Sequence, residues 1–135
     1  MTIYTSDGEH SVNVGTGDIW YSLYSTAVVR FPKNLTERIP HAMKFLKNGE
    51  CRAEDVAITN EEMNTVIKEM SSLKPDSLVY DLKKPETAPP WGSNIASSVD
   101  SCANLFTTAD GDDLFTEIGK LLSYAEDSKM SICAG

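Results

Sequence analysis

The chain has 135 residues, 41% of them hydrophobic, with two Trp, five Tyr and four Phe. This length fits one domain, residues 1–135, and the hydrophobic content excludes a disordered acidic tail. Twenty acids against twelve Lys and Arg give a net charge of −8. That charge argues against nucleic acid or an anionic membrane surface as the main ligand, because phosphate binding needs clustered Lys and Arg.

The cysteines and the N-terminal residues indicate in which cellular compartment the protein is expected. Cys51, Cys102 and Cys133 are an odd number without a Cys-x-x-Cys pair, so free thiols in a reducing cytosol are expected. The first residues show no basic stretch followed by an apolar one, and no window approaches the length of an apolar membrane span. The sequence therefore predicts a cytoplasmic protein.

The first half of the chain predicts a hairpin followed by helices. Residues 2–5 and 10–14 are short, partly alternating segments on either side of Asp7-Gly8, which is typical of a β-hairpin. Apolar residues then recur at helical spacing from Asp18 to Phe31, with Thr16 or Asp18 as the cap and Pro32 as the stop. A second helix is expected from Pro40 to just before Gly49.

A third helix is predicted from a capping signal. Cys51–Ile58 fits either a strand or an irregular linker. Thr59 and Glu62 have the spacing of a capping box, in which each side chain bonds to the other residue's backbone N–H, so a helix is expected over Asn60–Leu73. Ser77–Leu82 then reads as a strand, and residues 83–97 as a long loop without periodicity.

The C-terminal part predicts one more helix. Cys102–Thr108 is a possible strand, followed by a turn at residues 109–111 and a helix over Asp112–Asp127. Ser131–Ala134 fits a final strand. Three to four helices packed on a small, mainly antiparallel sheet, without a repeated strand–helix–strand order, give an α+β fold.

No catalytic, cofactor or metal site is predicted. The two histidines, His10 and His41, are far apart in sequence, so neither a two-histidine metal site nor a Ser-His-Asp triad is indicated. Gly15-Thr16-Gly17-Asp18 lacks the Lys-Ser/Thr of a phosphate loop, and Trp20 stands where a dinucleotide fingerprint needs its third glycine.

The densest acidic run, residues 110–127, has two interpretations. Asp110, Asp112, Asp113 and Glu117 suggest calcium at first sight, but the spacing of an EF-hand is not met. A turn and favourable charge at a helix N-terminus explain them better, and they remain available as a protein-binding face. Trp91, in a Pro-Pro-Trp-Gly-Ser-Asn loop, is either packed over the sheet edge or a binding anchor.

Three stretches together resemble the immunity protein 70 family of bacterial polymorphic toxin systems. The stretches are Gly15-Thr16-Gly17-Asp18 with the following Ile19-Trp20-Tyr21-Ser22-Leu23-Tyr24-Ser25-Thr26, then Pro89-Pro90-Trp91-Gly92-Ser93-Asn94-Ile95, and Thr107-Thr108-Ala109-Asp110-Gly111-Asp112-Asp113-Leu114-Phe115. Arg38-Ile39-Pro40 and Val79-Tyr80-Asp81 are similar in order and spacing, so the resemblance covers nearly the whole chain.

The resemblance implies a cytoplasmic antidote that binds and blocks a cognate toxin domain, as in contact-dependent growth inhibition. The charge of −8 fits a basic partner, and a nuclease is expected because nucleic-acid-cleaving domains carry basic clefts. The residues predicted to contact the toxin are Asp110, Asp112, Asp113 and Glu117, then Trp91 and Asp81. Two alternatives stay open: a small-molecule site or enzyme using the 83–97 loop, and a structural subunit using an exposed sheet edge.

Overall fold

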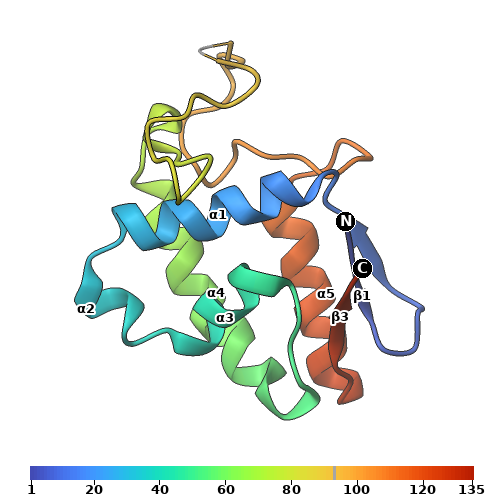
Figure 1. The fold of residues 1–135 in the computed structure, drawn as a ribbon. Helices are drawn as coiled ribbons and strands as arrows, with labels where there is room; N and C mark the ends of the chain where they lie inside the picture. The colour runs from blue at the N-terminus through green and yellow to red at the C-terminus, as the bar shows by residue number, and fades with distance from the viewer. Residues whose placement is uncertain (93) are drawn as a thin grey trace.

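The computed structural model describes residues 1–92 and 94–135 and has an α+β architecture (Figure 1). The strands are β1 (Thr2–Thr5), β2 (Ser11–Asn13) and β3 (Ile132–Ala134); the α-helices are α1 (Gly17–Arg30), α2 (Lys33–Thr36), α3 (Pro40–Asn48), α4 (Val56–Ser71) and α5 (Leu114–Ser128); two 3-10 turns, η1 (Ala53–Asp55) and η2 (Pro75–Ser77), complete the order. The predicted fold class is thereby confirmed.

The sheet joins the two ends of the chain. Its order is β2-β1-β3, and both pairings are antiparallel, with Ile3 opposite Val12 on one side and Ala134 on the other. Backbone hydrogen bonds of 2.9 Å and 3.0 Å link Thr2 to Gly135, so the termini lie side by side beside α5 (Figure 1). The predicted hairpin and the predicted final strand are confirmed.

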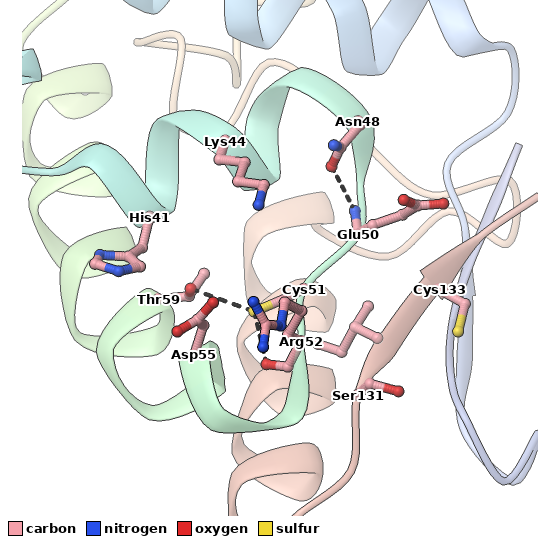
Figure 2. A pocket seen from close by; sticks show the side chains of 11 residues that line it. His41, Lys44, Asn48, Glu50, Cys51, Arg52, Asp55, Thr59, Ser131 and Cys133 are labelled. Atoms are coloured by element: carbon pink, nitrogen blue, oxygen red, sulfur yellow. Dashed lines mark hydrogen bonds between the residues drawn. The ribbon is translucent and has the colours of Figure 1, made fainter.

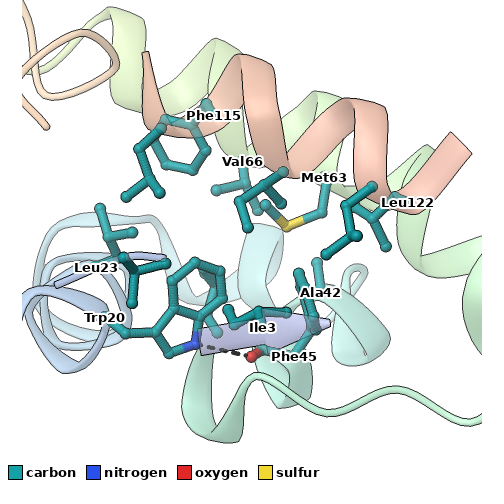
Figure 3. Close-up of a cluster of buried hydrophobic side chains, with 14 of the residues drawn as sticks. Ile3, Trp20, Leu23, Ala42, Phe45, Met63, Val66, Phe115 and Leu122 are labelled. Carbon is teal, nitrogen blue, oxygen red and sulfur yellow. Dashed lines mark hydrogen bonds between the residues drawn. The ribbon is translucent and has the colours of Figure 1, made fainter. Parts of the chain in front are cut away.

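The core lies between the helices and one face of the sheet. Trp20 of α1 is buried, and its indole N–H donates to the Phe45 carbonyl of α3 at 3.1 Å (Figure 3). Ile3 from β1 and Phe115 from α5 pack into the same cluster. Full burial of one large apolar side chain stabilises a fold by about 1.5–3 kcal/mol, so these contacts hold the helices against the sheet.

The ends of α3 form as its sequence predicts. Pro40 occupies the first turn, and Gly49 ends the helix with a φ of 74°, in the left-handed region that favours glycine. A Cβ on Gly49 would lie 2.8 Å from the Met1 side chain and 3.1 Å from that of Ala134. Gly49 therefore both ends α3 and lets the chain pass close to the sheet.

The predicted start of α4 is wrong by one turn. The helix begins at Val56, directly after η1, and not at Asn60. The capping box does not form because the Glu62 carboxylate accepts hydrogen bonds from the backbone N–H groups of His41 and Ala42, at 2.8 Å and 3.1 Å. Glu62 thus caps the N-terminus of α3 instead of its own helix, and Thr59 is buried inside α4.

Two predicted strands are also wrong, at Ser77–Leu82 and Cys102–Thr108. In the first, the backbone N–H of Val79 donates to the Thr26 hydroxyl of α1, so a helix side chain takes the place of a neighbouring strand. In the second, only Thr107 pairs, in an isolated bridge with Asp113. The single-turn helix α2 was not predicted at all.

Candidate functional site

The acidic turn before α5 presents two free carboxylates. The turn is closed by a 2.7 Å bond from the Thr108 N–H to the Asp112 carbonyl, while the Thr108 hydroxyl accepts from the N–H groups of Asp110 and Asp112. Gly111, between the two aspartates, has a φ of 90°. Both aspartates are exposed, so their side chains stand at the surface while their backbone is fixed.

The other two predicted acids of this cluster carry structural bonds. Asp113 is the N-cap of α5 and accepts from the N–H of Thr116 at 3.0 Å and from its hydroxyl at 2.7 Å. Glu117 forms an ion pair with Lys120 at 3.1 Å. The cap stabilises α5 directly, so Asp113 has a role in folding whatever it binds.

Trp91 is packed into the surface. Its ring is half-buried and lies edge-on between Tyr80, with ring centroids 6.0 Å apart, and Phe106, at 5.7 Å. Trp91 is therefore packed, but both ring partners lie outside the three strands, so these contacts do not show the expected packing over the sheet edge. Part of the indole stays accessible. Trp91 therefore fixes the shape of the loop around it.

Asp81 lies next to this aromatic group. Its carboxylate accepts from the Lys83 N–H at 2.9 Å, and with Asp18 and Tyr80 it lines a shallow recess. The Tyr80 hydroxyl donates to Asp18 at 3.3 Å. Burial, followed by the charge of Asp18, raises the pKa of Tyr80 above its usual value. Tyr80 therefore stays a neutral hydrogen-bond donor beside two carboxylates.

A row of contacts connects the predicted residues. Asp81 directly follows Tyr80, and the Tyr80 ring contacts the Trp91 ring. Trp91 in turn contacts the ring of Phe106. The residue after Phe106, Thr107, forms a backbone bridge with Asp113. Residues 85–119 contain six acids and no Lys, Arg or His. Asp81 lies outside residues 85–119, close to Lys83 and Lys84. The contacts link Asp81 and Trp91 to Asp113 at the start of α5, where Asp110, Asp112 and Glu117 are its neighbours in sequence; this row of side chains is here called the acidic strip.

Hydroxyl groups of α1 hold this strip in place, a role that the sequence did not reveal. Thr26 accepts from the Val79 N–H at 2.9 Å, and Ser25 accepts from the Leu82 N–H at 3.1 Å. Both side chains are fully buried. A second polar stripe on α1, beside its apolar one, is the signal that could have indicated that an irregular segment crosses this helix.

A cleft of about 330 Å³ lies elsewhere, between α3, the segment before α4, and β3 (Figure 2). Lys44 points into it from α3, and Arg52 and Asp55 lie across from it. Arg52 is paired with Glu54, and His41 with Glu62 at 2.9 Å. The lining therefore holds both basic and acidic side chains, Lys44 and Arg52 with Glu50 and Asp55.

The chemistry of this cleft does not favour catalysis. Cys51 lies in its wall, and its thiol is 3.3 Å from the Thr59 hydroxyl. Burial raises the pKa of Cys51 above its usual value, so the thiol stays protonated at neutral pH and is a poor nucleophile. His41, the one titratable ring in the cleft, has its Nδ1 bonded to Glu62.

The recess beside Trp91 lacks the convergent polar groups that the small-molecule alternative requires. It encloses about 320 Å³, and its described lining is mainly apolar, with Asn94 and Thr107 as the polar exceptions. Ser93, part of the second stretch of the family resemblance, lies outside the described residues. Within the described chain no group of three His, Cys, Asp or Glu could hold a metal ion.

Comparison with known proteins gives a match to one protein family. A sequence model of the family described as immunity protein 70 matches residues 3–133, nearly the full length. No curated protein and no solved structure matches the chain. Among residues 1–92 and 94–135, no helix has the length and apolar character needed to span a bilayer.

Proposed function

The chain belongs to the immunity protein 70 family, and we propose that it protects its bacterium by binding and neutralising one cognate toxin domain in the cytoplasm. The family supports an immunity protein of a toxin–immunity system. We further propose that the toxin is a nuclease, blocked by coverage of its active site or of a neighbouring site. Contact-dependent growth inhibition is a setting in which such a pair would work.

The observation that carries the proposal is the acidic strip. The turn before α5 presents the exposed carboxylates of Asp110 and Asp112, and residues 85–119 around it in the sequence contain six acids and no Lys, Arg or His. Carboxylates facing a basic cleft can occupy positions that phosphates of a nucleic acid would take, and they speed the encounter of the two proteins. We propose that the exposed pair Asp110 and Asp112 makes the first contact with the toxin, and that Trp91 and Asp81, at the other end of the acidic strip, extend the interface.

The experiment uses the toxin domain encoded next to the gene of this chain. The purified domain and this chain, mixed at micromolar concentration, are expected to co-elute in gel filtration, and nuclease activity is expected to fall as the complex forms. Co-expression is expected to restore growth. Absence of a complex would refute the proposal, whereas a complex that leaves nuclease activity intact would refute inhibition alone.

A charge-reversal pair tests the surface. Asp110→Lys with Asp112→Lys is expected to slow association at least tenfold at low salt, with a smaller effect on dissociation. The matched control is Glu37→Lys with Glu50→Lys, which changes the net charge by the same amount at exposed positions elsewhere. Equal slowing by both pairs would show that total charge, and not this strip, guides the encounter. Asp113 is left intact because it caps α5.

A further inference from the structure

Ile58 is an exposed apolar side chain on the outer surface of α4. Its side chain is 42% exposed, although isoleucine is among the residues most often buried. Because α4 begins at Val56, Ile58 stands on a regular helix, away from the buried stripe that includes Val56, Thr59 and Met63. Rigid backbone beneath an exposed apolar group lowers the entropic cost of binding through it.

Two grooves meet at Ile58. One encloses about 430 Å³ and runs between α4 and the segment containing Leu35 and Arg38. The other encloses about 500 Å³ and is lined by Asn60, Asn64 and Glu126. Ile58 and Glu61 line both grooves, so their two side chains form a ridge, here called the Ile58–Glu61 ridge.

The surroundings of the ridge are polar and negative. Two exposed acids lie here, Glu61 on α4 and Glu126 on α5, whereas the neighbouring Glu62 is occupied by the N-terminus of α3. Across the second groove, the carboxylate of Glu126 accepts from the Asn60 side chain at 3.2 Å, which fixes its position beside α4. Arg38 is the basic residue of the first groove. An apolar anchor ringed by polar and charged groups is the arrangement found at binding hot spots.

From this arrangement we propose that the Ile58–Glu61 ridge is a contact surface for a basic protein partner, with Ile58 filling an apolar pocket on that partner. Lys or Arg side chains of the partner pair with Glu61 and Glu126. The inference rests on the proposed function, since the partner is taken to be the same toxin domain. It adds a second contact region, about 20 Å along α5 from the acidic turn, given the 1.5 Å rise per helical residue between Asp113 and Glu126.

The test measures binding of immobilised, catalytically inactive toxin domain from the neighbouring gene. Ile58→Ala is expected to raise Kd about 30-fold, the loss typical of a hot-spot residue, mostly through faster dissociation. Val29→Ala is the matched control, because Val29 is exposed to a similar extent, 40%, on α1. This control is expected to change Kd less than about twofold.

A second variant isolates the charges. Glu61→Gln with Glu126→Gln keeps the size of both side chains and one acceptor oxygen on each while removing the charges. It is expected to slow association several-fold at low salt and little at high salt. Thermal unfolding of each variant checks that the fold is retained.

The outcomes separate the two proposals. A wild-type chain that forms no complex refutes the proposed function and the ridge with it. A complex that Ile58→Ala leaves unchanged, or that Val29→Ala weakens equally, refutes the ridge alone. Loss of affinity confined to Ile58→Ala, together with the salt-dependent effect of the glutamine pair, supports it.

Discussion

Glu62 links two helices, and its removal is expected to destabilise the fold strongly. Its carboxylate accepts from the backbone N–H groups of His41 and Ala42, at 2.8 Å and 3.1 Å, and lies 2.9 Å from the His41 ring nitrogen. The Glu62 side chain is 10% exposed and Ala42 is fully buried. Water therefore cannot replace the carboxylate at the Ala42 N–H.

The magnitude follows from the unpaired groups. Leaving a buried donor without its partner costs about 1–3 kcal/mol, and loss of a helix cap costs about 0.5–2 kcal/mol. Glu62→Ala is therefore expected to lower the free energy of unfolding by roughly 2–4 kcal/mol, a large share of the about 5–15 kcal/mol available to a domain. Glu62→Gln can keep the Oε1 acceptor that bonds both backbone N–H groups and change only the atom that faces the His41 ring, so we expect less than half that loss.

Urea denaturation followed by circular dichroism measures this difference, with Glu61→Ala as the control. Glu61 precedes Glu62 on the same helix but is exposed, and its substitution is expected to change the stability by less than about 0.5 kcal/mol. If Glu62→Ala proves as mild as Glu61→Ala, the carboxylate is not the cap of α3. The melting temperature gives a second reading, with about 4 °C expected per kcal/mol at this size.

Three further predictions concern the segment before α5 and the cysteines. Thr26→Val removes the acceptor of the Val79 N–H and is expected to cost about 1–3 kcal/mol and to speed hydrogen exchange at Val79, as NMR would show. Asp113→Ala removes the cap of α5 and is expected to cost about 1 kcal/mol in urea denaturation. Burial raises the pKa of Cys102 to about 11 from 9.0, so alkylation at pH 8 is expected to label the less buried Cys133 first, as mass spectrometry would show. Because the folded pKa of Cys102 is the higher one, its contribution to stability is complete below about pH 9 and is lost as the pH rises toward 11.

Elements whose signals are local in sequence were predictable. Asp7-Gly8 lies between the two hairpin strands, Pro40 and Gly49 mark the two ends of α3, and the apolar stripe of α5 repeats at helical spacing. Each of these signals acts through neighbours within a few residues, so no knowledge of the tertiary structure is needed to interpret it.

Elements that depend on distant partners were not predictable. Thr59 and Glu62 have the spacing of a capping box, but the carboxylate bonds to residues about 20 positions away, at the start of α3. Val79 resembles a strand residue, but its backbone partner is a hydroxyl 53 residues earlier. In both cases a tertiary hydrogen bond outweighs the local preference, and a pattern-based reading has no means of detecting it.

Within the candidate site, too, features that depend on neighbouring residues were predictable and tertiary contacts were not. A turn at Asp110 followed by a helix could be predicted from the sequence, but the helix begins at Leu114, with Asp113 as its cap, and not at Asp112. The packing of Trp91 between Tyr80 and Phe106 depends on residues up to 15 positions away. The sequence therefore could not decide whether the Trp91 side chain is packed or exposed. Their common role in toxin binding stays a prediction.

Charge in this protein is unevenly distributed, and that distribution bears on how a partner would approach. Residues 30–52 hold six of the twelve basic residues against two acids, while residues 85–119 hold six acids and no base. The net charge of −8 therefore combines a positive region around α2 and α3 with a strongly negative one before α5. A basic partner would be attracted by the second region and repelled by the basic residues of the first, so it would approach the Ile58–Glu61 ridge from the side of Glu126 and not from that of Arg38. The field therefore orients the encounter as well as speeding it. Such orientation acts before contact and is screened within about 10 Å at 0.1 M salt, so the association rate should fall with salt more steeply for the native chain than for the Asp110→Lys, Asp112→Lys pair.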